Sequence, residues 1–135
     1  MFLAAFVLTS VLESSFPDLD AGYIGLKCDT WLRLVIFALS TMILPPVTEE
    51  LFYRKSLISF KSKGILIVTA ILGMFLYALE HSLSLWGIVL TMIWALPLTI
   101  SYVKTKNIYV PMTAHMIGNL LENGMDVIMT VIAWI

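Results

Sequence analysis

The stretch Glu49-Glu50-Leu51-Phe52-Tyr53-Arg54 places three charged residues inside one of the most apolar parts of the chain. Residues 34–44, shortly upstream, carry no charge. On an α-helix, Glu50 and Arg54 are four residues apart, so they share a face and can form an ion pair. Glu49 is five residues before Arg54, about 140° around the helix, and points elsewhere. The sequence therefore predicts one carboxylate held by its own helix and a second, Glu49, free for another role.

The composition is that of a membrane protein. The 135 residues are 60% hydrophobic and 13% charged, whereas soluble domains carry about 25% charged residues. The mean hydropathy is +0.96. We therefore expect a single domain over 1–135 that is all-α, a polytopic transmembrane bundle of about 4–6 helices. The net charge of -1 gives no basic face for nucleic acid.

Apolar runs and turn residues divide the chain into segments. A partial first helix and an acidic loop over 13–29 are expected within 1–30, and Asp29-Thr30 supplies N-cap residues for the next helix. Pro45-Pro46 should kink or restart that helix, and Pro97 should interrupt a later one. The predicted helices are 2–12, 31–44, 46–60, 65–81, 86–103 and 108–135.

Basic residues gather in two turns, 55–63 and 104–106, which two predicted spans separate. Both turns therefore lie on one side of the membrane, and the acidic loop 13–29 lies on the other. Cytoplasmic loops carry an excess of Lys and Arg. We expect the two basic turns to be cytoplasmic.

Several ionisable residues lie within the predicted helices, where they are costly and mark functional sites by default. Tyr77 and His81 share a helix face, as do His115 and Asn119, because each pair is four residues apart. Counting about 1.5 Å per residue from the basic turns places Glu49 and His81 about 20–25 Å deep but His115 only about 12 Å deep. Tilted or partly re-entrant helices would be needed to bring them together. The ionisable residues are Arg33, Glu49, Glu50, Arg54, Glu80, His81, His115, Glu122 and Asp126.

These residue types suit the hydrolysis of an amide bond. A carboxylate such as Glu49 can take a proton from water, with His81 helping to position that water. Histidine and amide N–H groups, here from His115 and Asn119, can hold the developing oxyanion. In this scheme the pair of Glu50 with Arg54 holds the helix in place.

A metal site is the alternative chemistry. Two histidines and a carboxylate form a common catalytic zinc set, and Glu49, His81 and His115 could supply it. The local HExxH signature is absent. Glu80 precedes His81, and the positions three and four residues after His81 hold Ser84 and Leu85 instead of a second histidine. The residues alone leave both schemes open, with a divalent metal such as zinc or with no cofactor.

Three motifs together carry a family resemblance. Glu49-Glu50-x-x-x-Arg54, Tyr77-x-x-x-His81 and His115-x-x-x-Asn119 resemble the motif set of the CAAX-protease and bacteriocin-processing (CPBP, or Abi) intramembrane protease family. The resemblance covers about residues 31–125, in the order of the family. It implies a CAAX-prenyl-endoprotease-like helical core and an intramembrane endopeptidase activity, described in the family as either zinc-dependent or glutamate-based.

Carried over by position, the resemblance also implies a site and a substrate class. The substrate would be a membrane-associated peptide such as a bacteriocin, a pheromone or a prenylated-type tail, and the location a bacterial cytoplasmic membrane. Three positions depart from the family pattern: Tyr77 replaces the usual phenylalanine, Lys55 a frequent glycine, and Glu80 adds a charge beside His81. The implied catalytic residues are Glu49, Glu50, Arg54, His81, His115 and Asn119.

Two rival functions belong to other classes. A non-catalytic or partly catalytic bacteriocin self-immunity protein would keep the same fold and bind a membrane peptide or receptor. A small transporter fragment would use the same polar groups to couple to ion flux. The intact motif set favours the protease.

Overall fold

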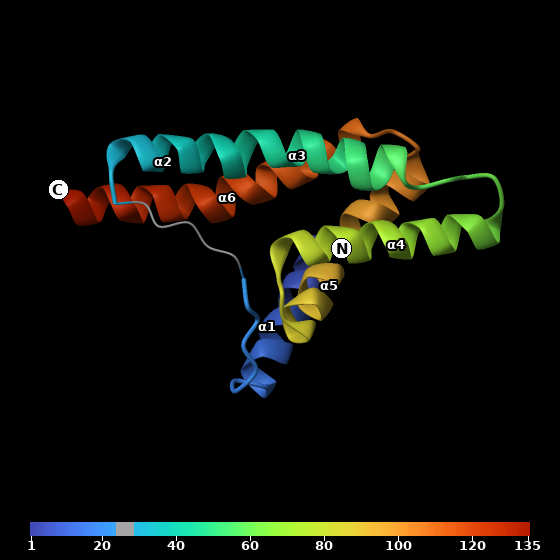
Figure 1. Ribbon diagram of the computed structural model, residues 1–135, viewed down its shortest axis with the longest axis horizontal. Coiled ribbons are helices and arrows are strands. Elements are labelled where there is room, and N and C mark those ends of the chain that lie inside the picture. The colour runs from blue at the N-terminus through green and yellow to red at the C-terminus, as the bar shows by residue number, and fades with distance from the viewer. Residues whose placement is uncertain (24–28) are drawn as a thin grey trace.

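The computed structural model describes residues 1–23 and 29–135, and within these ranges the regular structure is helical, with one isolated bridge between Tyr23 and Ser82 (Figure 1). This confirms the predicted all-α fold. Residues 31–56 form one long helix in four parts, α2 Trp31–Ala38, a π-helical turn η1 Leu39–Ile43, α3 Leu44–Glu49 and a second π-helical segment η2 Glu50–Ser56. The other helices are α1 Phe2–Ser15, α4 Lys63–His81, α5 Leu85–Thr105 and α6 Tyr109–Trp134.

Hydroxyl side chains begin three of these helices. Thr30 Oγ1 accepts a hydrogen bond from the Arg33 N–H at 3.3 Å, which confirms the predicted N-cap. Ser62 and Ser84 cap α4 and α5 in the same way. Each hydroxyl satisfies a backbone donor that has no partner inside its helix.

Three predicted boundaries were wrong. The first helix continues to Ser15, and the long helix ends at Ser56 instead of near residue 60. Helix α5 runs without a break through Pro97, because helices packed in a membrane protein tolerate a proline when neighbouring groups compensate for it. Residues 24–28 of the predicted acidic loop lie outside the described ranges.

The two consecutive prolines produce a widened turn instead of a sharp break. Helix α3 begins at Leu44, and Pro45 and Pro46 stand in its first turn, the part of a helix that tolerates proline best. Just before it, the N–H of Leu44 bonds to the carbonyl of Leu39, five residues back, as a π-helix requires. The predicted restart is therefore present, two residues earlier than expected.

The helices pack in two connected groups. Helix α6 lies alongside the long helix, and α5 packs between α1 and α4 and also contacts α6 (Figure 1). The C-terminal half of α4 reaches segment η2, where Gly73 lets the backbone oxygen of Tyr53 approach closely. A buried cluster of Tyr53, Met74, Tyr77 and Ala95 forms the core at this meeting point.

Within residues 1–23 and 29–135, three helices are long and apolar enough to cross a bilayer: Trp31–Ser56, Lys63–His81 and Leu85–Thr105. Large apolar side chains on their outer faces are exposed, among them Leu32 and Val68. Such surfaces are stable only in contact with lipid. The chain is an integral membrane protein, as its composition predicts.

The two basic turns meet at one end of the helices. Lys106 Nζ lies 5.5 Å from the ring centroid of Phe60, and Ile58, Tyr102 and Ile108 form one buried cluster there. At the other end of α4, the hydroxyls of Ser82 and Ser84 donate to the carbonyl of Ala21, in the acidic loop, at 2.6 and 2.8 Å. The basic turns and the described part of the acidic loop therefore pack at opposite ends of α4.

Candidate active site

The predicted ion pair between Glu50 and Arg54 forms the base of the site. Arg54 Nη1 lies 3.0 Å from Glu50 Oε1, and the two side chains are only 1% and 0% exposed. Both charges are therefore removed from solvent. Such a pair persists in an apolar interior only when further polar groups support it.

His115, on α6, provides that support and connects the two glutamates. Its Nδ1 donates to Glu50 Oε1 at 2.9 Å, and its Nε2 lies 3.8 Å from Glu49 Oε2. The carboxylate of Glu50 therefore fixes the orientation of the ring and leaves Nε2 directed at Glu49. Glu49 is also buried, and it points away from Arg54 toward a different partner, as the helix geometry predicts.

Polar atoms without hydrogen bonds surround this cluster. Among the described residues, Glu49 Oε2, Glu50 Oε2 and both terminal nitrogens of Arg54 are buried and have no well-directed hydrogen-bond partner. A buried polar atom without a partner costs about 1–3 kcal/mol. Such atoms are rare in folded proteins and accumulate where a protein binds or transforms another molecule.

The ring of Tyr77 lies at the centre of the site. Arg54 Cζ lies 4.6 Å from its centroid, and the ring centroids of His81 and His115 lie 4.3 and 6.0 Å away. His81 stands in the last turn of α4, half-buried, and its Nδ1 lies 2.9 Å from the carbonyl oxygen of Tyr77, to which it can donate. Tyr77 thus links the long helix, α4 and α6.

Asn119 attaches α6 to the widened turn of the long helix. Its Nδ2 donates to the backbone oxygen of Thr41 at 2.7 Å. In an α-helix this oxygen would accept from residue 45, and in a π-helix from residue 46, but Pro45 and Pro46 have no N–H. One N–H of the Asn119 amide therefore satisfies a carbonyl that the prolines leave without a backbone donor.

Tyr77 belongs to the site and Tyr53 packs next to it, outside the group of Glu49, His115 and Asn119, and neither tyrosine is among the residues that the sequence motifs implied as catalytic. The hydroxyl of Tyr53 donates to Glu80 Oε2 at 2.6 Å, and the Tyr53 ring packs edge-on against Tyr77 at 5.6 Å. The sequence signals were present, because Tyr53 precedes Arg54 and Tyr77 shares a helix face with His81. Glu80 is exposed beside the site and is held by this hydrogen bond.

The expected difference in depth is wrong, and the early end of the long helix explains part of the error. Glu49 lies seven residues before the end of that helix at Ser56, and His115 lies six residues after the start of α6 at Tyr109. Both are thus about 9–11 Å from the helix ends that carry the basic turns. His81 joins them from the opposite end of α4.

The residues do not form the metal set that the sequence suggested. Glu49 and His115 face each other, but the described residues contain no group of three or more His, Cys, Asp or Glu side chains arranged to hold a metal ion. The Nδ1 of His81 faces a backbone carbonyl of its own helix, which leaves Nε2 as the ring nitrogen that another group can reach. No step of the chemistry below depends on a metal.

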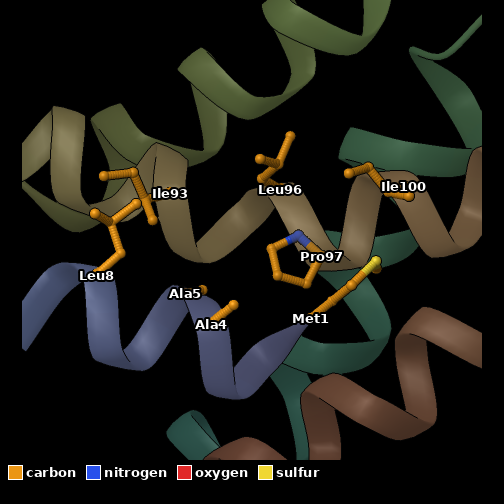
Figure 2. A pocket seen from close by; sticks show the side chains of 8 residues that line it. All are labelled: Met1, Ala4, Ala5, Leu8, Ile93, Leu96, Pro97 and Ile100. Atoms are coloured by element: carbon orange, nitrogen blue, oxygen red, sulfur yellow. The ribbon is translucent and has the colours of Figure 1, made fainter.

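The polar cluster is separate from the cavity of about 220 Å³ between α1 and α5 (Figure 2). Apolar residues line that cavity, and Pro97 of α5 faces Ala4 and Ala5 of α1 across it. An apolar cavity of this kind offers no group for acid–base chemistry. The chemistry of the chain therefore belongs to the polar cluster.

Comparison with known proteins points to one family. The family model described as "Type II CAAX prenyl endopeptidase Rce1-like" matches residues 31–121, which are 91 of the 135 residues. No curated protein and no solved structure matches the chain. The matched range contains Glu49, Glu50, Arg54, His81, His115 and Asn119.

Proposed function

The chain belongs to the Rce1-like family of type II CAAX prenyl endopeptidases, and from this premise we propose that it hydrolyses a peptide bond of a membrane-associated peptide with Glu49 as the general base. The observation that carries the proposal is the buried, unbonded Oε2 of Glu49, 3.8 Å from His115 Nε2. A carboxylate in this position can accept a proton from a water molecule held beside it.

His115 and Asn119 are the proposed oxyanion donors. Because Glu50 accepts from Nδ1, the Nε2 of His115 carries a hydrogen only in the imidazolium form, and this is the form that acts as a donor. Asn119 has a second amide N–H besides the one given to Thr41. Two such donors in a site shielded from water stabilise a tetrahedral intermediate effectively.

The proposed hydrolysis has two steps, the addition of water and the collapse of the tetrahedral intermediate. Glu49 removes a proton from water as its oxygen bonds to the carbonyl carbon, and the carbonyl oxygen becomes an oxyanion. When the intermediate collapses, the C–N bond breaks and the protonated Glu49 gives its proton to the leaving nitrogen. The products are a carboxylic acid and an amine, which become a carboxylate and an ammonium group when the second proton of the water passes from one to the other, and the Glu49 carboxylate is restored.

Glu50, Arg54 and His81 have supporting roles in this proposal. Glu50 orients His115, and Arg54 balances the charge of Glu50. His81, which contacts the Tyr77 ring, helps to position the water. The rival metal scheme would need Glu49, His81 and His115 to come together as ligands.

The substrate and the orientation in the membrane complete the proposal. The family description supports a prenylated CAAX-type tail, and a bacteriocin or a pheromone is the alternative peptide. We place the basic turns 55–63 and 104–106 on the cytoplasmic side of a bacterial membrane. The peptide then reaches the site from within or beside the bilayer.

A cleavage assay in liposomes tests the proposal. The probe is a farnesylated peptide ending in Cys-Val-Ile-Ser, whose products are identified by mass spectrometry. We expect wild-type protein and a Glu13→Gln control, altered in α1 far along the chain from the motifs, to release the last three residues. Glu49→Gln and His115→Ala should release none, and chelator should leave the wild-type rate unchanged.

Other outcomes would favour a different function. Cleavage by Glu49→Gln at the wild-type rate would contradict the enzyme proposal. If instead a host carrying Glu49→Ala survived a cognate bacteriocin as well as wild type does, the site would serve immunity by binding alone. Inhibition by chelator would indicate the metal scheme.

A further inference from the structure

The ring of Tyr77 stands among the polar groups of the site, with Arg54 over its face and His81 and His115 beside it. The side chain is only 6% exposed. The described residues offer the Tyr77 hydroxyl no hydrogen bond, whereas the hydroxyl of the neighbouring Tyr53 donates to Glu80 at 2.6 Å. Among the described residues, the Tyr77 hydroxyl is not one of the fully buried polar atoms without a partner, so it stands where a substrate can reach it.

The ring of Tyr77 is held firmly, so the hydroxyl has a fixed place. Arg54 lies over the ring at 4.6 Å, His81 stacks at 4.3 Å, and His115 meets the ring edge-on at 6.0 Å. These contacts come from three helices. A donor that is fixed in advance stabilises developing charge without reorganisation during the reaction.

The other donors at the site are few. Asn119 gives one of its two amide hydrogens to Thr41, and His115 gives its Nδ1 hydrogen to Glu50. Arg54 lies 3.0 Å from Glu50 Oε1 and over the face of the Tyr77 ring, and its terminal nitrogens form no well-directed hydrogen bond. His115 and Asn119 therefore offer an oxyanion one hydrogen each, and the Arg54 guanidinium is held beside the Glu50 carboxylate.

We propose that the Tyr77 hydroxyl is a further catalytic residue that donates a hydrogen bond to the oxyanion formed at the scissile carbonyl. The inference rests on the proposed peptidase function. As the hydroxide adds to the carbonyl carbon, the O–H of Tyr77 hydrogen-bonds to the oxygen that gains charge. The proton stays on tyrosine, and the bond weakens when the C–N bond breaks and the carbonyl re-forms.

Tyr77→Phe isolates this role, because phenylalanine keeps the ring and its contacts. The resemblance to the CPBP family makes phenylalanine the usual residue at this position, so the variant is expected to fold. Tyr53→Phe is the matched control, since it removes a hydroxyl from the adjacent ring that is already bonded to Glu80. The two variants differ in whether the lost hydroxyl was free to reach a substrate.

Two readouts separate catalysis from packing. Cleavage of the farnesylated Cys-Val-Ile-Ser peptide gives kcat and KM, and binding of its phosphinate analogue, which mimics the tetrahedral intermediate, needs no turnover. We expect Tyr77→Phe to lower kcat on the order of 10²-fold with KM nearly unchanged, and to weaken analogue binding by a similar factor. Tyr53→Phe should stay within about twofold of wild type in both.

The outcomes distinguish this inference from the proposed function. If Glu49→Gln is inactive and Tyr77→Phe matches wild type in kcat and analogue affinity, the tyrosine role is overturned and the peptidase stands. If Tyr77→Phe raises KM with kcat intact, the hydroxyl binds the substrate and the transition state equally well, and the oxyanion role is likewise overturned. Glu49→Gln with wild-type activity would overturn the peptidase function itself.

Discussion

Removing one partner of the Glu50–Arg54 pair should destabilise the protein more than removing both. The pair is 3.0 Å apart and at most 1% exposed, so its attraction is about 5.5 kcal/mol at an effective dielectric constant of about 20. Arg54→Met leaves the Glu50 carboxylate buried with His115 as its remaining polar partner. Deleting one member of a buried pair costs about 3–5 kcal/mol, and we expect that range here.

The double variant Glu50→Gln/Arg54→Met removes both charges at once. Because no uncompensated charge remains, its cost should fall short of the sum of the two single variants by at least about 2 kcal/mol. The free energy of unfolding is measured by denaturant titration in mixed micelles for the wild type, the two single variants and the double variant, which together form a double-mutant cycle. A control pair, Asp29 with Arg33, is exposed on both sides and should show coupling below about 1 kcal/mol. Additive costs for Glu50 and Arg54 would refute the view that the site rests on a buried ion pair.

Two further predictions concern the contacts that assemble the site. At Gly73 a Cβ atom would lie 2.6 Å from the backbone oxygen of Tyr53, so Gly73→Ala should lower the free energy of unfolding by about 1–3 kcal/mol. Gly118→Ala on α6, where nothing lies within 4 Å, should be neutral or stabilising by up to about 1 kcal/mol in the same titration, and equal effects of the two variants would contradict the close approach. Asn119→Ala should cost about 1–3 kcal/mol because it leaves the Thr41 oxygen without a donor. Pro45→Ala restores an N–H four residues after Thr41, so the double variant Pro45→Ala/Asn119→Ala should recover part of that cost, and a fully additive result would exclude this explanation.

Much of the fold follows from the sequence because the membrane allows few solutions. Apolar length and basic turns identify the spans, and the hydroxyls at Thr30, Ser62 and Ser84 mark helix starts. The end of the long helix at Ser56 was missed, because the apolar pattern continues through Phe60 after the helical hydrogen bonds have ended. That error accounts for about 6 Å of the difference in depth expected between Glu49 and His115.

The site was predictable where it depends on spacing along one helix and unpredictable where helices meet. Glu50 with Arg54 follows from a four-residue spacing, and the structure confirms it. The bond from His115 to Glu50 spans 65 residues, and the bond from Asn119 to Thr41 spans 78. Neither follows from helix periodicity, because each depends on the position of α6 along the axis of the long helix.

The expected metal set illustrates the same limit. Residue type suggests Glu49, His81 and His115 as ligands, but whether three such side chains come together depends on how the helices meet, and the described residues contain no such group. The roles of Glu49, His115 and Asn119 in catalysis stay proposals, supported by their convergence around one buried cluster. The cleavage rates of variants at these three positions test the proposed roles.

The most direct test is the single-turnover rate of peptide cleavage by Glu49→Gln in liposomes, measured beside wild type with matched unfolding midpoints. Glutamine keeps the shape of the side chain and cannot accept the proton of water. Our account predicts a rate lower by about 10²–10⁴-fold. A rate within about threefold of wild type would show that Glu49 is not the base and would contradict the central claim.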